Sequence, residues 1–165
     1  MTRNIESYIE GAEKVSQFFG EWPSFHDAEV VEMNFWRGRI YPGDWDDRNV
    51  FPVITVKILV LEATQAAQSG SGRDLLITLR FHVADQITVK DFNHDNSIVG
   101  LSITERARGH YTDGTPLPPD LLVTFQPGFG VAAHFSCARI EVIGAEWANG
   151  ASLGNPTSTG SATTE

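Results

Sequence analysis

Residues 53–61 read VITVKILVL, and residues 75–83 read LLITLRFHV. In the second stretch apolar residues recur at every other position from Leu75 to Val83, and this period of two predicts a strand. The first stretch is β-branched and apolar on nearly both faces, which is typical of a central strand. These two stretches predict that a sheet organises the chain.

The same period of two recurs along most of the remaining sequence. No helical pattern lies between the predicted strands, so the crossovers that parallel neighbours need are missing. We therefore expect a curved, mainly antiparallel sheet of about six to eight strands. A change of phase near residues 137–138 predicts a bulge. The further strands are expected near residues 31–35, 87–89, 99–103, 121–125 and 131–142.

The N-terminal segment has a helical period instead. Apolar residues recur there at three- and four-residue spacing from Ile5 to Phe19, which predicts one amphipathic helix of about four turns. Asn4 is placed to cap its start and Gly20 to end it, and Pro23 prevents its continuation. The expected fold class is therefore α+β, with an N-terminal helix packed on the sheet.

Length and composition predict one domain with a tail. The chain has 165 residues, of which 41% are hydrophobic and 20% charged, and this composition excludes a mostly disordered chain. We expect residues 3–147 to form a single α+β domain. Residues 148–165 read ANGASLGNPTSTGSATTE, which predicts a flexible polar tail.

Charge and cysteine content exclude some classes of partner and site. The net charge of -9 disfavours nucleic acid as a partner, because phosphate binding requires clustered Lys and Arg. The single cysteine, Cys137, cannot form an internal disulfide, which suits a cytoplasmic protein. The N-terminus lacks the apolar region of a signal peptide, and Lys57 interrupts the longest apolar stretch, so we expect no membrane partner.

The segment from Trp22 to Ala28, WPSFHDA, is the most distinctive in the chain. His26 and Asp27 are residue types that serve as a general acid and base. Adjacent residues usually point apart, so we favour a structural motif of Trp22, Pro23, Phe25, His26 and Asp27 that packs the helix exit against the sheet. The enzymatic alternative is a small hydrolase or metal-dependent enzyme that uses His26 and Asp27.

No sequence pattern predicts a cofactor, a metal site or a catalytic residue. The five histidines lie far apart, without the short spacings of known metal signatures. The run DFNHDNS lacks the glycine and the glutamate of a calcium loop, so we expect a turn rich in Asn and Asp. Gly128-Phe129-Gly130 is expected to form a hairpin turn.

Negative charge is concentrated near the N-terminus, and one segment combines it with aromatic residues. Carboxylates can steer a basic protein, and an exposed aromatic side chain can anchor it. The alternative is a solvated loop whose Trp45 turns back into the domain. The predicted partner-binding residues of this segment are Tyr41, Asp44, Trp45, Asp46 and Asp47.

The run FFGEWPSFHDAEVVEMNFWR resembles the start of the immunity protein 50 family of bacterial polymorphic toxin systems. The later segments SIVGLSITE and VTFQPGFGVAAHFSCARIEV are also similar, so the resemblance spans about residues 5–145. It implies a cytoplasmic protein, not an enzyme, that neutralises a cognate toxin by binding it. It supplies no catalytic or toxin-binding residues.

Three hypotheses follow for the function. The first is the immunity protein, whose acidic charge suits a basic toxin domain such as a nuclease. The second is the enzyme that uses His26 and Asp27. The third is an assembly module that forms a homodimer through exposed strand edges.

Overall fold

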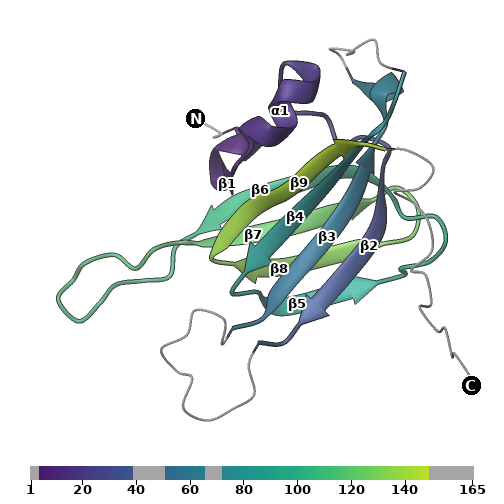
Figure 1. The fold of residues 1–165 in the computed structure, drawn as a ribbon. Helices are drawn as coiled ribbons and strands as arrows, with labels where there is room; N and C mark the ends of the chain where they lie inside the picture. Colours follow the sequence, from purple (N-terminus) through teal and green to yellow (C-terminus); the bar gives the residue numbers. More distant parts are fainter. Residues whose placement is uncertain (1–3, 39–50, 66–71, 149–165) are drawn as a thin grey trace, which may run out of the picture.

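The computed structural model describes residues 4–38, 51–65 and 72–148 (Figure 1). Within these ranges the chain is built mainly of strands. The helical elements are η1 (Ile5–Tyr8), α1 (Glu13–Phe19) and η2 (Glu62–Thr64). The strands are β1 (Ile9–Glu10), β2 (Ala28–Trp36), β3 (Val53–Val60), β4 (Leu75–His82), β5 (Asp85–Lys90), β6 (Ser97–Arg106), β7 (Asp120–Pro127), β8 (Ala132–Cys137) and β9 (Arg139–Trp147).

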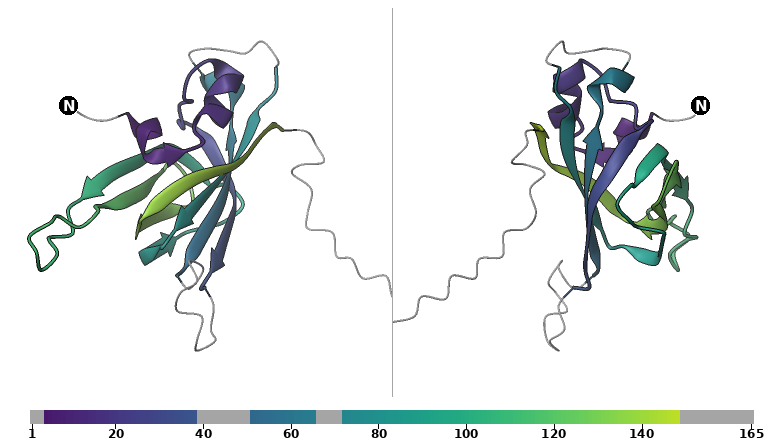
Figure 2. Two further views of the ribbon diagram at one scale, coloured as in Figure 1. Left: turned by 60° about the vertical axis from the view of Figure 1, so that its left-hand side comes forward. Right: turned by 90° about the vertical axis from the view of Figure 1, so that its right-hand side faces the viewer.

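The described strands form one nine-stranded sheet in the order β1-β9-β4-β3-β2-β6-β7-β8-β5. This sheet folds over itself, so that β9, β4, β3 and β2 make one layer and β6, β7, β8 and β5 lie behind it (Figures 1 and 2). Between β2 and β6 the layers are joined by a short pairing of Ala28 and Glu29 with Ile98 and Ser97. The turn from β4 to β5 and the turn from β8 to β9 also pass between them.

The expected α+β fold with a packed N-terminal helix is wrong. The sheet is mixed, because β1 runs parallel to β9, and the one α-helix among the described residues is the short α1. The physical cause is Gly11, whose φ of +74° breaks the helical path. Before it, Ile5–Tyr8 forms a 3-10 turn and Ile9–Glu10 pairs with β9, so the apolar stripe is divided among three elements.

The apolar stripe still packs against the sheet. Val15 and Phe19 of α1 are buried, and Gly20 ends the helix in the left-handed conformation with a φ of 80°. The rings of Phe18 and Phe19 meet Trp147 of β9 edge-on, at centroid distances of 5.0 and 5.8 Å. The helix therefore lies at one end of the layers (Figure 2).

The centre of the core is aromatic and lies between the layers. Phe81 of β4 meets Phe135 of β8 at 5.0 Å and Phe125 of β7 at 6.2 Å, in both cases edge-to-face. All three side chains are fully buried. Edge-to-face pairs add about 0.5–1.5 kcal/mol beyond the burial of their area, so these rings hold the layers together.

The change of phase near residues 137–138 marks a change of layer. Cys137 ends β8, Ala138 follows, and Arg139 begins β9 in the other layer. The backbone N–H of Ala138 donates to the carbonyl of His82, the last residue of β4. The predicted bulge is therefore a corner at which the chain leaves one layer and enters the other.

No helix in the described ranges is long and apolar enough to cross a membrane. The predicted domain of residues 3–147 falls mostly within these ranges. Of the predicted tail, residues 149–165 lie outside them.

Candidate partner-binding surface

The segment from Trp22 to Asp27 links α1 to β2. Phe25 is 5% exposed, Pro23 is also buried, and the rings of Trp22 and Phe25 lie 5.8 Å apart. The N–H of Ser24 donates to Oε1 of Gln65 at 2.8 Å, and Nε2 of Gln65 donates to the Ser24 carbonyl at 3.0 Å. The buried Gln65 side chain thus fixes the path of this segment.

His26 and Asp27 form an open surface pair. Nδ1 of His26 lies 3.0 Å from Oδ2 of Asp27, and the two side chains are 60% and 58% exposed. A cavity of about 380 Å³ lies near Trp22, but neither His26 nor Asp27 lines it. Within the part of the chain that the structure describes, this pair is therefore open to solvent, whereas a ligand site usually buries most of its ligand.

Two further candidate groups, His134 and Cys137, lie on β8. Within the described ranges, no three His, Cys, Asp or Glu side chains are grouped so that they could hold a metal ion. His134 shares a hydrogen bond with the hydroxyl of Thr124 at 3.0 Å. Cys137 is a free, buried thiol, and its burial raises the pKa to about 12, so it is protonated at neutral pH.

The residues predicted to bind a partner, Tyr41, Asp44, Trp45, Asp46 and Asp47, lie outside the described residues. They belong to the connection between β2 and β3. Their role stays a prediction.

Two turns pack against each other at one end of the layers. The first spans residues 91–96 between β5 and β6, and the second spans residues 128–131 between β7 and β8. Lys90 pairs with Ala132 where the first turn begins and the second ends, and the N–H groups of Gly128 and Phe129 both donate to the carbonyl of Ser97. The two turns are therefore fixed to one another and to β6.

The first turn is held by its own side chains. Oδ1 of Asn96 accepts from the N–H of Asn93 at 2.8 Å, and Nδ2 of Asn96 donates to the Asn93 carbonyl at 2.6 Å. Asn96 is 3% exposed, and its N–H donates to Oε1 of Glu29 on β2 at 2.8 Å. This segment is the expected turn rich in Asn and Asp, in which local hydrogen bonds replace strand pairing.

These turns expose two aromatic side chains among acids. Phe129 is 71% exposed and Phe92 is 47% exposed. Asp91 and Asp95 lie on the first turn, and Asp27 is connected to β6 by the hydrogen bond from its N–H to the Ile98 carbonyl at 2.9 Å. We call Asp27, Asp91, Phe92, Asp95 and Phe129 the turn cluster.

Two residues of the turn cluster have an uncommon backbone conformation. Asp27 and Asp91 both have positive φ, at 61° and 57°. Asp tolerates the left-handed region better than most residues, but such positions persist only where the surrounding structure holds them. The surroundings of Asp27 and Asp91 therefore hold the backbone at these two positions.

Sequence reasoning treated both turns as connections and missed their aromatic residues. The available signal was the composition of the turns. DFNHDN and PGFG each contain a phenylalanine among residues that form solvated turns. A large apolar side chain in such a setting has no strand face on which to be buried, so its exposure was predictable.

Three segments that are far apart in the sequence meet at this surface. Asp27 belongs to the first segment, Ile98 to the second and Phe129 to the third, and backbone hydrogen bonds connect the first and third to β6. Comparison of the chain with models of protein families, with curated proteins and with solved structures found no match.

Proposed function

We propose that this chain is an immunity protein that acts in the cytoplasm, where it binds a cognate toxin domain and blocks it without catalysis. One observation supports this proposal most directly. Phe129 has a large apolar side chain that is 71% exposed. It lies on a turn that is held by the hydrogen bonds from the N–H groups of Gly128 and Phe129 to the Ser97 carbonyl. An exposed aromatic group on a rigid support is the kind of anchor that dominates protein–protein interfaces.

The energetics of such an anchor are favourable. Complete burial of a Phe side chain is worth about 1.5–3 kcal/mol. Because the turns are already held by Asn93, Asn96 and Ser97, little further ordering is needed on binding. Two aromatic residues on one such support can therefore contribute much of the affinity.

The charge of the chain supports a basic partner. The net charge is -9, and the turn cluster contributes Asp27, Asp91 and Asp95. Carboxylates around an apolar centre raise the rate of encounter with a cationic surface and exclude acidic partners. The segment with Asp44, Asp46 and Asp47 is a second proposed contact, which rests on the sequence alone.

Binding of a basic toxin domain, first captured from the native host with this chain as bait and then purified, tests the proposal, with Phe129→Ala as the main variant. We expect its dissociation constant to rise by about 10-fold or more, in line with loss of a central aromatic anchor. Tyr111→Ala is the matched control, because Tyr111 is 52% exposed in the connection between β6 and β7. Absence of any toxin binding by the unaltered chain would refute the proposed function.

The second proposed contact has its own test. Replacement of Asp44, Asp46 and Asp47 by Lys is expected to weaken binding of the same toxin. Unchanged affinity would remove that segment from the interface and leave the turn cluster as the proposed surface.

A further inference from the structure

The outer side of β2 is an open strand edge over most of its length. β2 pairs with β3 from Glu29 to Trp36, but its pairing with β6 stops at Glu29. The N–H of Val30 still donates to the Asn96 carbonyl at 3.1 Å. From Val31 to Trp36, no strand within the described ranges pairs with the side of β2 that faces away from β3. This edge lies at the margin of its layer (Figure 1).

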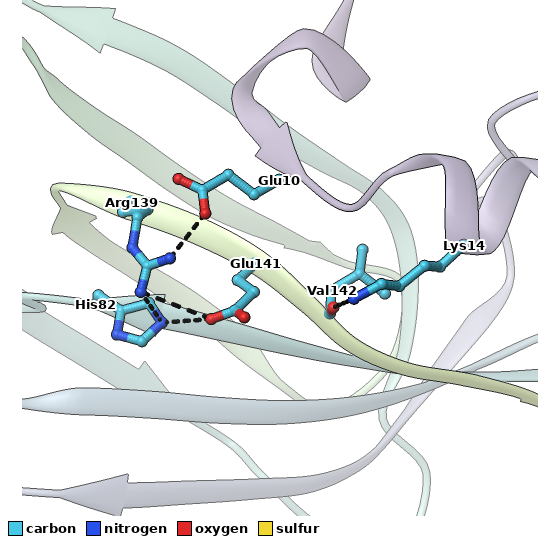
Figure 3. A network of polar contacts seen from close by, with 6 residues as sticks. All are labelled: Glu10, Lys14, His82, Arg139, Glu141 and Val142. Carbon is cyan, nitrogen blue, oxygen red and sulfur yellow. Dashed lines mark hydrogen bonds and ion pairs between the residues drawn. The ribbon is translucent and has the colours of Figure 1, made fainter.

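The edge at one end of the sheet is closed. β1 covers part of the outer side of β9, and α1 packs against Trp147 near the end of that strand. Nη1 of Arg139 lies 2.7 Å from Oε2 of Glu10, and Nζ of Lys14 donates to the Val142 carbonyl at 3.2 Å (Figure 3). β1 itself has two residues, so it offers another strand little backbone to pair with.

The edge at the other end of the sheet, β5, is irregular. Gln86 has a φ of 52°, and the register of β5 against β8 shifts between Asp85 and Thr88. The strand begins and ends with a charged residue, Asp85 and Lys90. Bulges and charged residues are devices by which edge strands avoid pairing with other chains. β5 is therefore protected against such pairing.

The open edge of β2 lacks this protection and carries exposed aromatic side chains on both faces. Its register with β3 is regular from Glu32 to Trp36, and this part contains neither proline nor lysine. Phe35 is 50% exposed and Trp36 is 43% exposed. Phe35 is opposite the buried Ile54 of β3, so it lies on the face that covers the core, and Trp36 lies on the other face. A regular edge with exposed aromatic residues is open to pairing with another strand.

The charge of this edge distinguishes between possible partners. Its one acid, Glu32, lies 2.7 Å from Nζ of Lys57 on β3, and Arg37 follows directly after the strand. The edge therefore lacks the excess of negative charge that gives the whole chain its net charge of -9. The carboxylates that would attract a basic toxin are gathered in the turn cluster, whereas a second copy of this acidic chain meets little repulsion at the edge of β2.

We infer that two copies of this chain associate through the open edges of β2, which pair antiparallel about a two-fold axis. Such pairing is self-complementary, because each copy offers the N–H and carbonyl groups that the other needs. Asn34 is the middle residue of the regular part, so an axis beside it uses all of that part. Asn34 then faces its own copy, and Met33 of each chain faces Phe35 of the other. A methionine sulfur beside an aromatic ring is a favourable contact.

Sedimentation velocity of the full chain tests this inference without a toxin. The paired part is short, so we expect a weak dimer, with the mean mass rising from one chain at about 2 μM toward two chains at about 500 μM. Added salt should strengthen association, because it screens the net negative charge of the two copies. A mass of one chain at every concentration would overturn the inference.

Two lysine substitutions locate the interface. Phe35→Lys places a charge on the edge of β2, and we expect it to stay monomeric at about 500 μM with its circular dichroism spectrum preserved. Ile87→Lys is the matched control, because Ile87 is 40% exposed on the edge strand β5. It should dimerise like the unaltered chain. Equal association of the two variants would overturn the assignment to β2.

Oxidative cross-linking tests the register. Opposed residues of antiparallel strands have Cβ atoms about 4.5–5.5 Å apart, so Asn34→Cys brings two thiols within reach of a disulfide. Oxidised glutathione serves as the oxidant, and the native Cys137 is buried, so it does not compete. Thr88→Cys is the matched control, since Thr88 is exposed on β5. We expect the covalent dimer to form about 10-fold faster in Asn34→Cys, and equal rates would overturn the inference.

Discussion

The carbonyl oxygen of Asp95 occupies the space that a Cβ atom on Gly130 would need. Such a Cβ would also lie 2.8 Å from Oδ1 of Asn96, and Gly130 has a φ of +74°. Glycine is therefore required here for two reasons, the close approach of the two turns and the left-handed backbone.

Gly130→Ala is expected to lower the free energy of unfolding by about 2–4 kcal/mol, because it adds a backbone clash to the conformational strain. Gly114→Ala is the control, since Gly114 has a φ of +84° but nothing within 4 Å of an added Cβ. Its loss should be about 1–2 kcal/mol. Urea unfolding measures both, and equal losses would contradict the close packing of the turns.

The acids of the turn cluster can be neutralised without a change of backbone. Asn tolerates positive φ as Asp does, so Asp27→Asn combined with Asp91→Asn preserves the turns. We expect the association rate with a basic toxin to fall severalfold, and the dissociation rate to change little. Stopped-flow measurements at low and high salt check this, and an association rate that salt does not affect in either protein would contradict electrostatic steering.

Val83 has a φ of 56° at the corner between β4 and β5, a conformation that a β-branched residue rarely adopts. The side chain is 39% exposed, so little burial is lost on replacement. Val83→Asn is therefore expected to raise the free energy of unfolding by about 0.5–1 kcal/mol.

Val99→Asn is the control for this substitution. Val99 is 46% exposed but lies within β6, where a β-branched residue is favourable. Its replacement should lower stability in the same urea titration. A loss of stability in Val83→Asn would show that the corner is not strained.

Cys137 is 1% exposed, and burial raises its pKa from 9.0 to about 12. The folded state therefore favours the neutral thiol. This contribution to stability is complete below pH 9 and declines as the pH rises toward 12, because only the unfolded thiol ionises in that range.

Alkylation of Cys137 by iodoacetamide at pH 8 should consequently be at least about 100-fold slower in the folded chain than in urea. Labelling of the folded chain at the rate of a small free thiol would contradict its burial.

The sequence predicted the strands better than their arrangement. The alternation at 75–83 and the apolar run at 53–61 correspond to β4 and β3, which pair with each other in the middle of one layer. Local patterns do not show that β8 and β9 separate at Ala138, because the phase change of a corner resembles that of a bulge.

The N-terminal helix shows how tertiary contacts override local periodicity. The stripe from Ile5 to Phe19 satisfies a helical pattern, but Gly11 weakens it and the edge of β9 offers pairing to Ile9 and Glu10. Periodicity identifies which side chains are buried, and it does not decide between a helix and a broken path that buries the same residues.

The type of surface could be predicted from the sequence, but the residues of the turn cluster could not. Charge and aromatic content predicted an acidic, aromatic surface for a basic protein in the segment with Tyr41 and Trp45, which lies outside the described ranges. Phe92 and Phe129 are 37 positions apart in the sequence, and the pairings of β5 with β8 and of β6 with β7 bring their turns together. Such long-range pairing is not encoded in a local motif.

Growth of a bacterium that expresses the cognate toxin is the most direct measurement. We predict that the unaltered chain restores growth, that Tyr111→Ala also does so, and that Phe129→Glu does not, although it is expressed and folded. Growth restored equally by Phe129→Glu would contradict the turn cluster as the binding surface. Failure of the unaltered chain to restore growth would contradict neutralisation itself.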